Sequence, residues 1–100
     1  MIEYTVRVDE YSTRWYLNGQ LHREDGPAVE WASGDKFWCL DGKYHRVDGP
    51  ALEYADGTKS WYLNDKVMSE ADFNKRTQAK ELTVNQLEGL LGYKIKVVGE

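Results

Sequence analysis

The alternation of apolar and polar residues along the first two thirds of the chain predicts short antiparallel β-strands. Residues 28–31 and 37–40 alternate in this way, and equivalent segments recur further along the chain. A period of two places successive side chains on opposite faces of a sheet. Glycine turns at residues 32–35 and 55–58 separate the segments, and glycine accepts a positive φ there at little cost. We therefore expect about six strands in a meander.

The same pattern returns at a spacing of 23 residues. Residues 13–35 align with residues 36–58 without a gap, and 12 of the 23 positions are identical. Trp15, Trp38 and Trp61 keep this register, a partial third copy follows, and a degenerate half-copy precedes the first. Self-similarity at a fixed period is typical of repeat architectures. The sequence thus predicts a mainly β fold with some helix, in which an antiparallel meander is built from 23-residue repeats.

Period two also assigns side chains to the two faces of the predicted sheet. One face is expected to be continuously apolar: Val6, Val8, Trp15, Leu17, Val29, Trp31, Trp38, Leu40, Leu52, Tyr54, Trp61 and Leu63. The other is expected to be mixed, with an aromatic row along its middle: Arg7, Arg14, Tyr16, Glu30, Phe37, Cys39, Glu53, Ser60 and Tyr62. An apolar face of this size must be covered by something.

The last third of the chain predicts two short helices and a final strand. Ser69 is a typical N-cap, and acidic residues follow it in the first turn of a helix that reaches about residue 78. Thr83 and Gln86 form a capping-box pattern, and Gly92 suits the end of the second helix. These elements would cover either one sheet face or an open edge.

Residues 93–98 alternate like a strand and close this segment. We expect residues 1–66 to form the repeat sheet and residues 67–100 to form a helix-helix-strand cap within the same domain. A chain of 100 residues is long enough for one domain.

Composition and charge exclude several kinds of partner. The net charge is −4, which disfavours binding to a nucleic-acid backbone. Aromatic residues make up 13% of the chain, with four Trp and seven Tyr, and such side chains suit half-wet surfaces. The single cysteine, Cys39, cannot form an intramolecular disulfide, and no apolar stretch would span a bilayer. We expect a cytoplasmic protein without a membrane partner.

A resemblance to a known family rests on two tracts. Residues 54–57 read Tyr-Ala-Asp-Gly, and residues 17–19 read Leu-Asn-Gly before a His-Arg-x-Asp-Gly-Pro loop. Across roughly residues 5–66 the chain resembles MORN repeats, with a shorter hairpin and a longer return loop. Small proteins with such loops also look like proteins encoded by bacteriophages. The resemblance implies a curved sheet used for contact with a protein or lipid, without chemistry, in the cytoplasm of a host cell.

The repeated loops hold the most conspicuous polar residues: His22, Arg23, Asp25, His45, Arg46 and Asp48. A shared metal ion is disfavoured, because equivalent residues lie two strands apart, about 9–10 Å, whereas zinc ligands lie about 2 Å from the ion. An arginine and an aspartate two residues later can pair on an extended segment. We expect the loops to tie one repeat to the next, with a binding edge as the alternative.

Catalysis finds little support in the sequence. Cys39 lies in the middle of a predicted strand beside apolar residues, where a thiol behaves as a small hydrophobe. No G-x-S-x-G or P-loop pattern occurs. Glu30 and Glu53 repeat on a flat sheet that offers no deep pocket for a glycosidase pair. We expect no catalytic residue, no cofactor and no metal.

The expected partner surface is the mixed face: Arg14, Tyr16, Glu30, Phe37, Glu53 and Tyr62. Exposed aromatic side chains flanked by charges are typical binding anchors, although the C-terminal helices would remove them if they covered this row. The leading hypothesis is a phage-type module that binds a host protein and inhibits or redirects it. A homodimer, a module that sequesters a ligand or nucleotide, and a membrane-associated module remain alternatives. A small hydrolase using the His/Asp loops ranks last.

Overall fold

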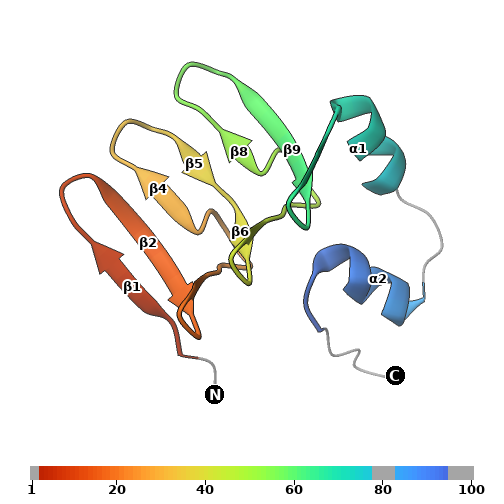
Figure 1. Ribbon diagram of the computed structural model, residues 1–100, viewed down its shortest axis with the longest axis horizontal. Helices are drawn as coiled ribbons and strands as arrows, with labels where there is room; N and C mark the ends of the chain where they lie inside the picture. Colours follow the sequence, from red (N-terminus) through yellow and green to blue (C-terminus); the bar gives the residue numbers. More distant parts are fainter. Residues whose placement is uncertain (1–2, 78–82, 95–100) are drawn as a thin grey trace.

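The structure is a computed structural model of the chain and describes residues 3–77 and 83–94. The described residues form ten short strands and two α-helices (Figure 1). The strands are β1 Thr5–Val8, β2 Ser12–Leu17, β3 Gln20–Leu21, β4 Val29–Trp31, β5 Lys36–Phe37, β6 Cys39–Leu40, β7 Lys43–Tyr44, β8 Leu52–Glu53, β9 Lys59–Leu63 and β10 Lys66–Met68. The helices are α1 Glu70–Thr77 and α2 Val84–Leu91.

The strands form one large antiparallel sheet and one small one. The large sheet has the spatial order β1-β2-β4-β5-β8-β9-β10, and β3 pairs with β2 beside this path. Strands β6 and β7 pair with each other as a second sheet. The expected class, mainly β with some helix, is confirmed. There are ten described strands rather than about six, because the segments after the tight turns pair locally as β3, β7 and β10, and the segment expected at residues 37–40 is divided into β5 and β6.

Two-residue turns create these local hairpins. Asn18 and Gly19 both have positive φ, 52° and 78°, and the same holds for Asp41 and Gly42 at 50° and 78°. Two successive positive φ angles define the type I′ turn, whose twist matches that of paired strands. The dipeptides Asn-Gly and Asp-Gly supply this conformation at the lowest steric cost. The chain therefore reverses immediately after β2 and again after β6.

Strand register distributes the side chains differently from our expectation. Val29 stands directly opposite Arg14 and also opposite Phe37, which in turn stands opposite Leu52. Residues directly opposite each other share a face of the sheet. Leu52 is likewise opposite Ser60. One face thus combines residues that we had placed on both.

The predicted apolar face is therefore wrong for the segments 29–31 and 52–54. Val29, Trp31, Leu52 and Tyr54 share a face with Phe37, whereas Glu30 shares the opposite face with Trp15. Alternation fixes the faces within one strand, but the return loop between strands sets the register across it. That loop places Val29 opposite Arg14, one position away from Trp15, and this single step exchanges the two faces of the segment.

The apolar core is small. The buried apolar residues are Ala28, Val29, Cys39, Leu40, Ala51, Leu52 and Phe73. Three polar residues, Ser12, His22 and His45, are also buried. Two of these are the loop histidines, so the return loops contribute to the interior.

Both predicted helices are present. Ser69 accepts a hydrogen bond from the Asp72 amide at the start of α1, 3.1 Å away. The Thr83 hydroxyl and the Gln86 side chain form a reciprocal capping box on α2, which ends at Gly92 with φ 90°. None of the described helices is long and apolar enough to cross a bilayer. The strand expected at residues 93–98 lies mostly outside the described residues.

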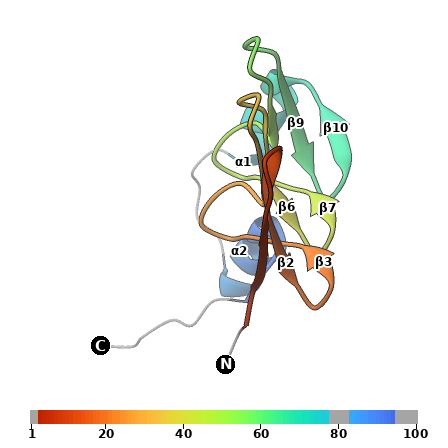
Figure 2. The ribbon, with the colours of Figure 1, turned by 90° about the vertical axis from the view of Figure 1, so that its left-hand side faces the viewer.

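The helices lie beside the sheet and do not cover its faces. Figure 1 shows α1 next to β9 and α2 near the end of β6, away from β2, β4 and β5. Phe73 of α1 is 3% exposed, and α1 packs against β9. In the edge-on view of Figure 2 the return loops project from one side of the sheet, whereas β3, β7 and β10 lie on the other. Neither helix shields the central strands.

Candidate functional site

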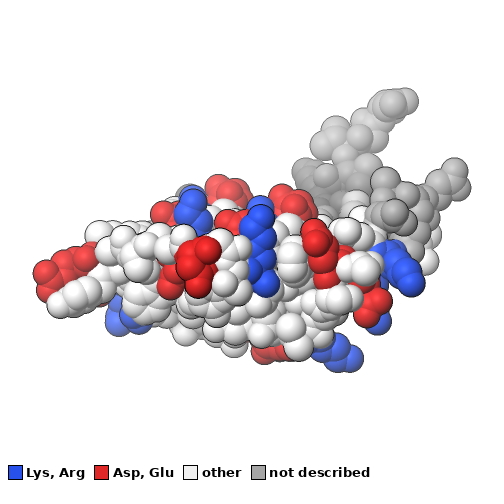
Figure 3. Space-filling view, turned by 90° about the horizontal axis from the view of Figure 1, so that it is seen from above, with Lys and Arg blue, Asp and Glu red and all other residues white. Residues whose placement is uncertain are grey.

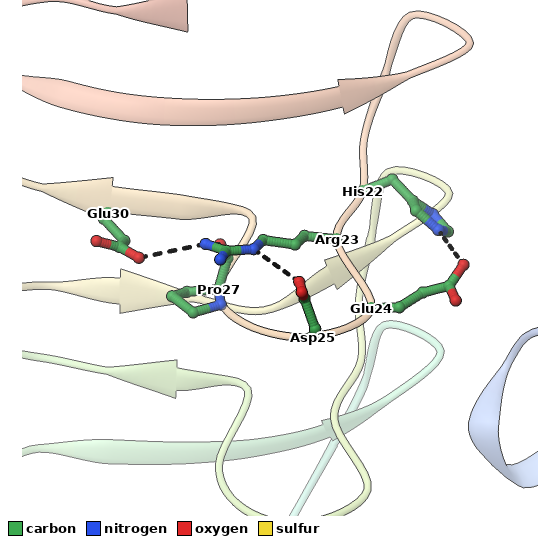
Figure 4. Close-up of polar contacts among 6 residues, drawn as sticks. All are labelled: His22, Arg23, Glu24, Asp25, Pro27 and Glu30. Atoms are coloured by element: carbon green, nitrogen blue, oxygen red, sulfur yellow. Dashed lines mark hydrogen bonds and ion pairs between the residues drawn. The ribbon is translucent and has the colours of Figure 1, made fainter. Parts of the chain in front are cut away.

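The first return loop folds onto one face of the sheet through Arg23. Its guanidinium donates to Asp25 at 3.0 Å and to the Pro27 carbonyl oxygen at 3.3 Å, and it reaches Glu30 of β4 at 3.4 Å (Figure 4). The same group lies 4.0 Å from the ring centre of Trp15. Arg23 is therefore held from three directions and stacked on an indole.

The second return loop makes the same contacts at shorter distances. Arg46 donates to Asp48 at 2.9 Å, to the Pro50 carbonyl oxygen at 3.0 Å and to Glu53 at 3.0 Å. Its guanidinium lies 3.8 Å from the ring centre of Trp38. The planar fork of arginine satisfies such a set of acceptors in a way that lysine does not. The Nε and Nη1 donors of this guanidinium are therefore used within the chain.

The two buried histidines tie each loop to the next hairpin. Nδ1 of His22 accepts from the Asp41 amide at 2.9 Å, and Nδ1 of His45 accepts from the Asn64 amide at 3.0 Å. Both acceptor nitrogens are thus occupied by backbone N–H groups 19 residues further along. Each ring links its own loop to the tight turn of the following hairpin.

The other ring nitrogens differ between the two histidines. Nε2 of His22 lies 3.2 Å from the Glu24 carboxylate (Figure 4), whereas Nε2 of His45 donates to the Leu90 carbonyl oxygen at 2.8 Å. Val47 replaces the glutamate in the second loop. A carbonyl near the end of α2 thus takes the place of the carboxylate, and His45 becomes the polar link between the sheet and the C-terminal helix.

The side chains with the most reactive chemistry are engaged or shielded. Burial lowers the pKa of His45 below its ordinary value, against hydrogen bonding to the backbone of Leu90 and Leu91, which raises it. Burial, with Asp65 nearby, raises the pKa of the Cys39 thiol to about 12. The described residues contain no group of three or more His, Cys, Asp or Glu side chains that could hold a metal ion. The loop arginines and histidines thus make contacts that hold the return loops to the sheet.

The face that carries these loops also carries alternating charges, and we call it the charged face. Glu30 stands opposite Lys36, which stands opposite Glu53. Glu53 in turn stands opposite Lys59. Seen from above in Figure 3, charged side chains of both signs gather along one long side of the molecule and are sparse along the other. Opposite charges in neighbouring strands favour the observed register.

The other face carries six aromatic rings, five of which contact one another, and we call it the aromatic face. The connected rings are Trp31, Phe37, Tyr44, Tyr54 and Tyr62, and Tyr16 lies on the same face apart from them. Phe37 lies at the centre, with ring-centre distances of 6.3 Å to Trp31 and 5.8 Å to Tyr54. Tyr44 links Phe37 at 6.1 Å to Tyr62 at 5.2 Å. All four contacts are edge-to-face, the arrangement that ring quadrupoles favour.

The charged side chains that strand register places on the aromatic face are positive. Arg14 lies over the Trp31 ring at 5.1 Å and Arg7 over the Tyr16 ring at 5.5 Å. Within the described strands, no acidic side chain has the register of this face. The buried Nε1 of Trp31 has no hydrogen-bond partner among the described residues. An unpaired buried donor costs about 1–3 kcal/mol, so Trp31 is held here at the expense of stability.

The structure divides the expected partner surface between the two faces. Arg14, Tyr16, Phe37 and Tyr62 lie on the aromatic face. Glu30 and Glu53 lie on the charged face, where they accept from Arg23 and Arg46. Three rings of the aromatic face, those of Trp31, Tyr44 and Tyr54, were missed, because their assignment depends on register and on the tight turns. In each loop the arginine pairs with the aspartate two residues later, whereas the histidine bonds to the tight turn of the following hairpin.

Two clefts lie near the C-terminal helix. One of about 520 Å³ lies between the two return loops and includes Arg23, Arg46, Trp38 and Leu91 in its lining. Another of about 650 Å³ lies between β10 and the helices and includes Lys66, Arg76 and Asp72. In the first cleft the guanidinium groups already have carboxylate and carbonyl partners within the chain.

Comparison with known proteins gives no family: no family model, curated protein or solved structure matches this chain. The resemblance to MORN repeats and to phage proteins therefore remains a prediction. The assignment of function rests on the geometry of the chain itself.

Proposed function

We propose that this protein is a non-enzymatic protein-binding module and that its aromatic face is the contact surface. The observation that supports this most is a connected set of five half-buried rings that neither helix covers (Figure 1). Tyr, Trp and Arg are the residue types most enriched at binding hot spots. The positive charge of Arg7 and Arg14 favours a partner that presents apolar groups beside carboxylates.

The absence of available reactive groups in the described loops supports a binding role over a hydrolase. His22 and His45 use Nδ1 to accept backbone amides, so this nitrogen is not available as a general base. Cys39 is buried and protonated at neutral pH. On the resemblance to phage proteins, we propose a host protein as the partner, which the module inhibits or redirects.

We further propose that the sheet is built from 23-residue repeats. Contacts that recur at this spacing support the idea: Arg23 over Trp15 and Arg46 over Trp38. The histidine contacts to Asp41 and Asn64 recur in the same way. A partner contacting a repeated surface meets similar rings at regular intervals, which favours an extended partner segment.

Alanine substitutions on the two faces test the proposal. The protein is immobilised, a partner is captured from a bacterial lysate and identified, and its affinity is then measured for each variant. Tyr44→Ala and Tyr62→Ala remove rings from the aromatic face, and we expect each to weaken binding at least about tenfold, the range of interface hot spots.

Lys36→Ala and Lys59→Ala are the matched controls, because both side chains are exposed on the charged face. We expect them to change the affinity less than about twofold, as side chains outside an interface core do. Equal losses on both faces, or unchanged binding when rings are removed, would show that the aromatic face is not the contact surface. Circular dichroism confirms that each variant remains folded.

A ligand-sequestering module is the second candidate, and the cleft of about 520 Å³ between the return loops favours it. Trp38 in its lining offers a surface for stacking a planar group. The arginine beside it is already stacked on that indole and paired with Asp48 and Glu53. Loss of small-molecule binding on Trp38→Leu, with partner binding unchanged, would favour this candidate.

A further inference from the structure

The two edges of the large sheet differ in what lies beside them. At the C-terminal end the last strand is β10, which has only three residues before α1 begins at Glu70, and α1 packs against the neighbouring β9 (Figure 1). At the other end, no described segment pairs with the outer side of β1. All four residues of β1 are exposed, and Val6 and Val8 are 41% and 72% exposed. The sheet thus ends in a very short strand at one edge and in a longer exposed strand at the other.

Hydrogen bonds show which backbone groups of β1 point outward. The Asp9 amide donates to the Ser12 carbonyl oxygen, so position 9 faces β2. The Trp15 amide donates away from β1, to Ala28, although Trp15 stands opposite Val6. Successive residues of a strand direct their N–H and C=O groups to opposite sides. Residues 5, 7 and 9 therefore bond to β2, and the groups of residues 4, 6 and 8 point outward.

We propose that β1 is a self-association edge, where it pairs antiparallel with β1 of a second copy of this chain about a two-fold axis at Val6. In this register Val6 faces its own equivalent, Tyr4 faces Val8 of the second copy, and Val8 faces Tyr4 of the second copy. Each of these three pairs is of the hydrogen-bonded type, so the outward amides and carbonyls of residues 4, 6 and 8 are all satisfied. The proposal does not depend on the proposed function.

Side-chain charge selects this register over its neighbour. A shift that centres the axis on Arg7 would place two arginines directly opposite each other, which is destabilising. With the axis at Val6, Arg7 faces Thr5 of the second copy, and the valines meet on the opposite face. If the axis fell between two residues, each residue would stand opposite one whose side chain lies on the other face of the sheet. A two-fold axis perpendicular to the sheet does not allow this, so such registers are excluded.

The short terminal strand β10 makes a second copy of β1 a better occupant than a growing fibre. Head-to-tail pairing would join β1 of one copy to β10 of the next and would allow continued addition. Because β10 has only three residues, it offers less backbone than residues 4–8 of a second β1, and pairing of β1 with β1 stops at two copies. A two-fold axis perpendicular to the sheet also places both aromatic faces on the same side, so the dimer would present a doubled surface.

The solution mass of the full chain tests the proposal. Sedimentation equilibrium over a concentration series should approach the mass of two 11.6 kDa chains. Val6→Pro removes one outward N–H without removing a bond to β2, and proline is tolerated on edge strands. We expect this variant to sediment as one chain, whereas Val6→Thr, which keeps the amide and suits a strand, remains dimeric. A parent chain that stays monomeric throughout the series overturns the proposal.

Cysteine crosslinking tests the register even if the proline variant fails to fold. Facing residues of a hydrogen-bonded pair lie about 5.5 Å apart at Cα, within the range of about 4.4–6.8 Å that a disulfide bridges. Under oxidation Val6→Cys should form a covalent dimer, whereas Arg7→Cys and Val8→Cys, which face other positions, should form far less. The parent, whose Cys39 is buried, is the control. Preferred crosslinking through position 7 or 8 overturns the register, and crosslinking at none of the three overturns the edge.

Discussion

Removing the guanidinium of Arg46 should destabilise the protein more than removing any other charged side chain of the return loops. Arg46 is 19% exposed and makes hydrogen bonds of 2.9–3.0 Å to three acceptors while stacking on Trp38. Asp48 is 80% exposed, so that pair contributes only about 0.2–1 kcal/mol. The bonds to Pro50 and Glu53 contribute about 1–3 kcal/mol each, and the stacking contributes about 0.5–2 kcal/mol.

We therefore expect Arg46→Ala to lower the free energy of unfolding by about 3 kcal/mol, once partial exposure is allowed for. Arg23→Ala should cost less, about 2 kcal/mol, because its contacts to Pro27 and Glu30 are longer, 3.3 and 3.4 Å. Urea unfolding followed by tryptophan fluorescence measures both. A loss below about 0.5 kcal/mol for Arg46→Ala, the scale of an ordinary surface substitution, would refute this reasoning.

Gly49 provides an independent test of the same contacts. A Cβ atom at this position would lie 2.7 Å from Cζ of Arg46, so Gly49→Ala forces the guanidinium away from its acceptors. We expect a loss of about 1–3 kcal/mol in the parent. In the Arg46→Ala background the obstacle is gone, and the same change should be neutral or stabilising by up to about 1 kcal/mol. Additive effects in this double-mutant cycle would show that the arginine moves aside at little cost and is not held in place.

Two further predictions concern the buried titratable groups. The folded state lowers the pKa of His45 below 6.5, so the unfolded chain binds the proton more readily. The free energy of unfolding should therefore fall as the pH drops from 6.5 towards that lower pKa. His45→Gln should flatten this dependence in urea titrations across the window, and an unchanged slope would contradict the assignment. Cys39, buried and with its pKa raised to about 12, should react with a thiol reagent only as fast as the native protein opens, and fully in urea. Rapid labelling without denaturant would contradict its burial.

The sequence was sufficient for the local elements. The turns at Asn18-Gly19 and Asp41-Gly42 and the capping box at Thr83 each depend on residues within a few positions, and the structure contains all of them. The number of strands differed because two-residue turns generate short return strands, which have too few residues to show alternation. Local chemistry thus predicts the elements better than it predicts how many of them pair.

The faces of the sheet could not be obtained from alternation alone. Whether Val29 lies opposite Arg14 or opposite Trp15 depends on the conformation of a return loop held by Arg23 and by Pro27. A displacement of one residue exchanges the faces of a whole segment. The sequence contains one indication of where the C-terminal helix packs. Val47 occupies the position of Glu24 in the second loop, so His45 lacks the carboxylate partner that His22 has. The Leu90 carbonyl takes that position.

The two faces of the sheet use their polar groups differently, and this separates stability from binding. On the charged face the loop arginines and histidines have partners within the chain, so substitutions there remove intramolecular contacts and should act on the free energy of unfolding. On the aromatic face Arg7 and Arg14 stack on rings at 5.5 and 5.1 Å, neither forms an ion pair with a described carboxylate, and the rings contact one another edge-to-face. Under the proposed function, a carboxylate of a second protein would approach these arginines without displacing one from the chain. The electrostatic gain on this face would then come from a partner, whereas on the charged face it already comes from contacts within the chain.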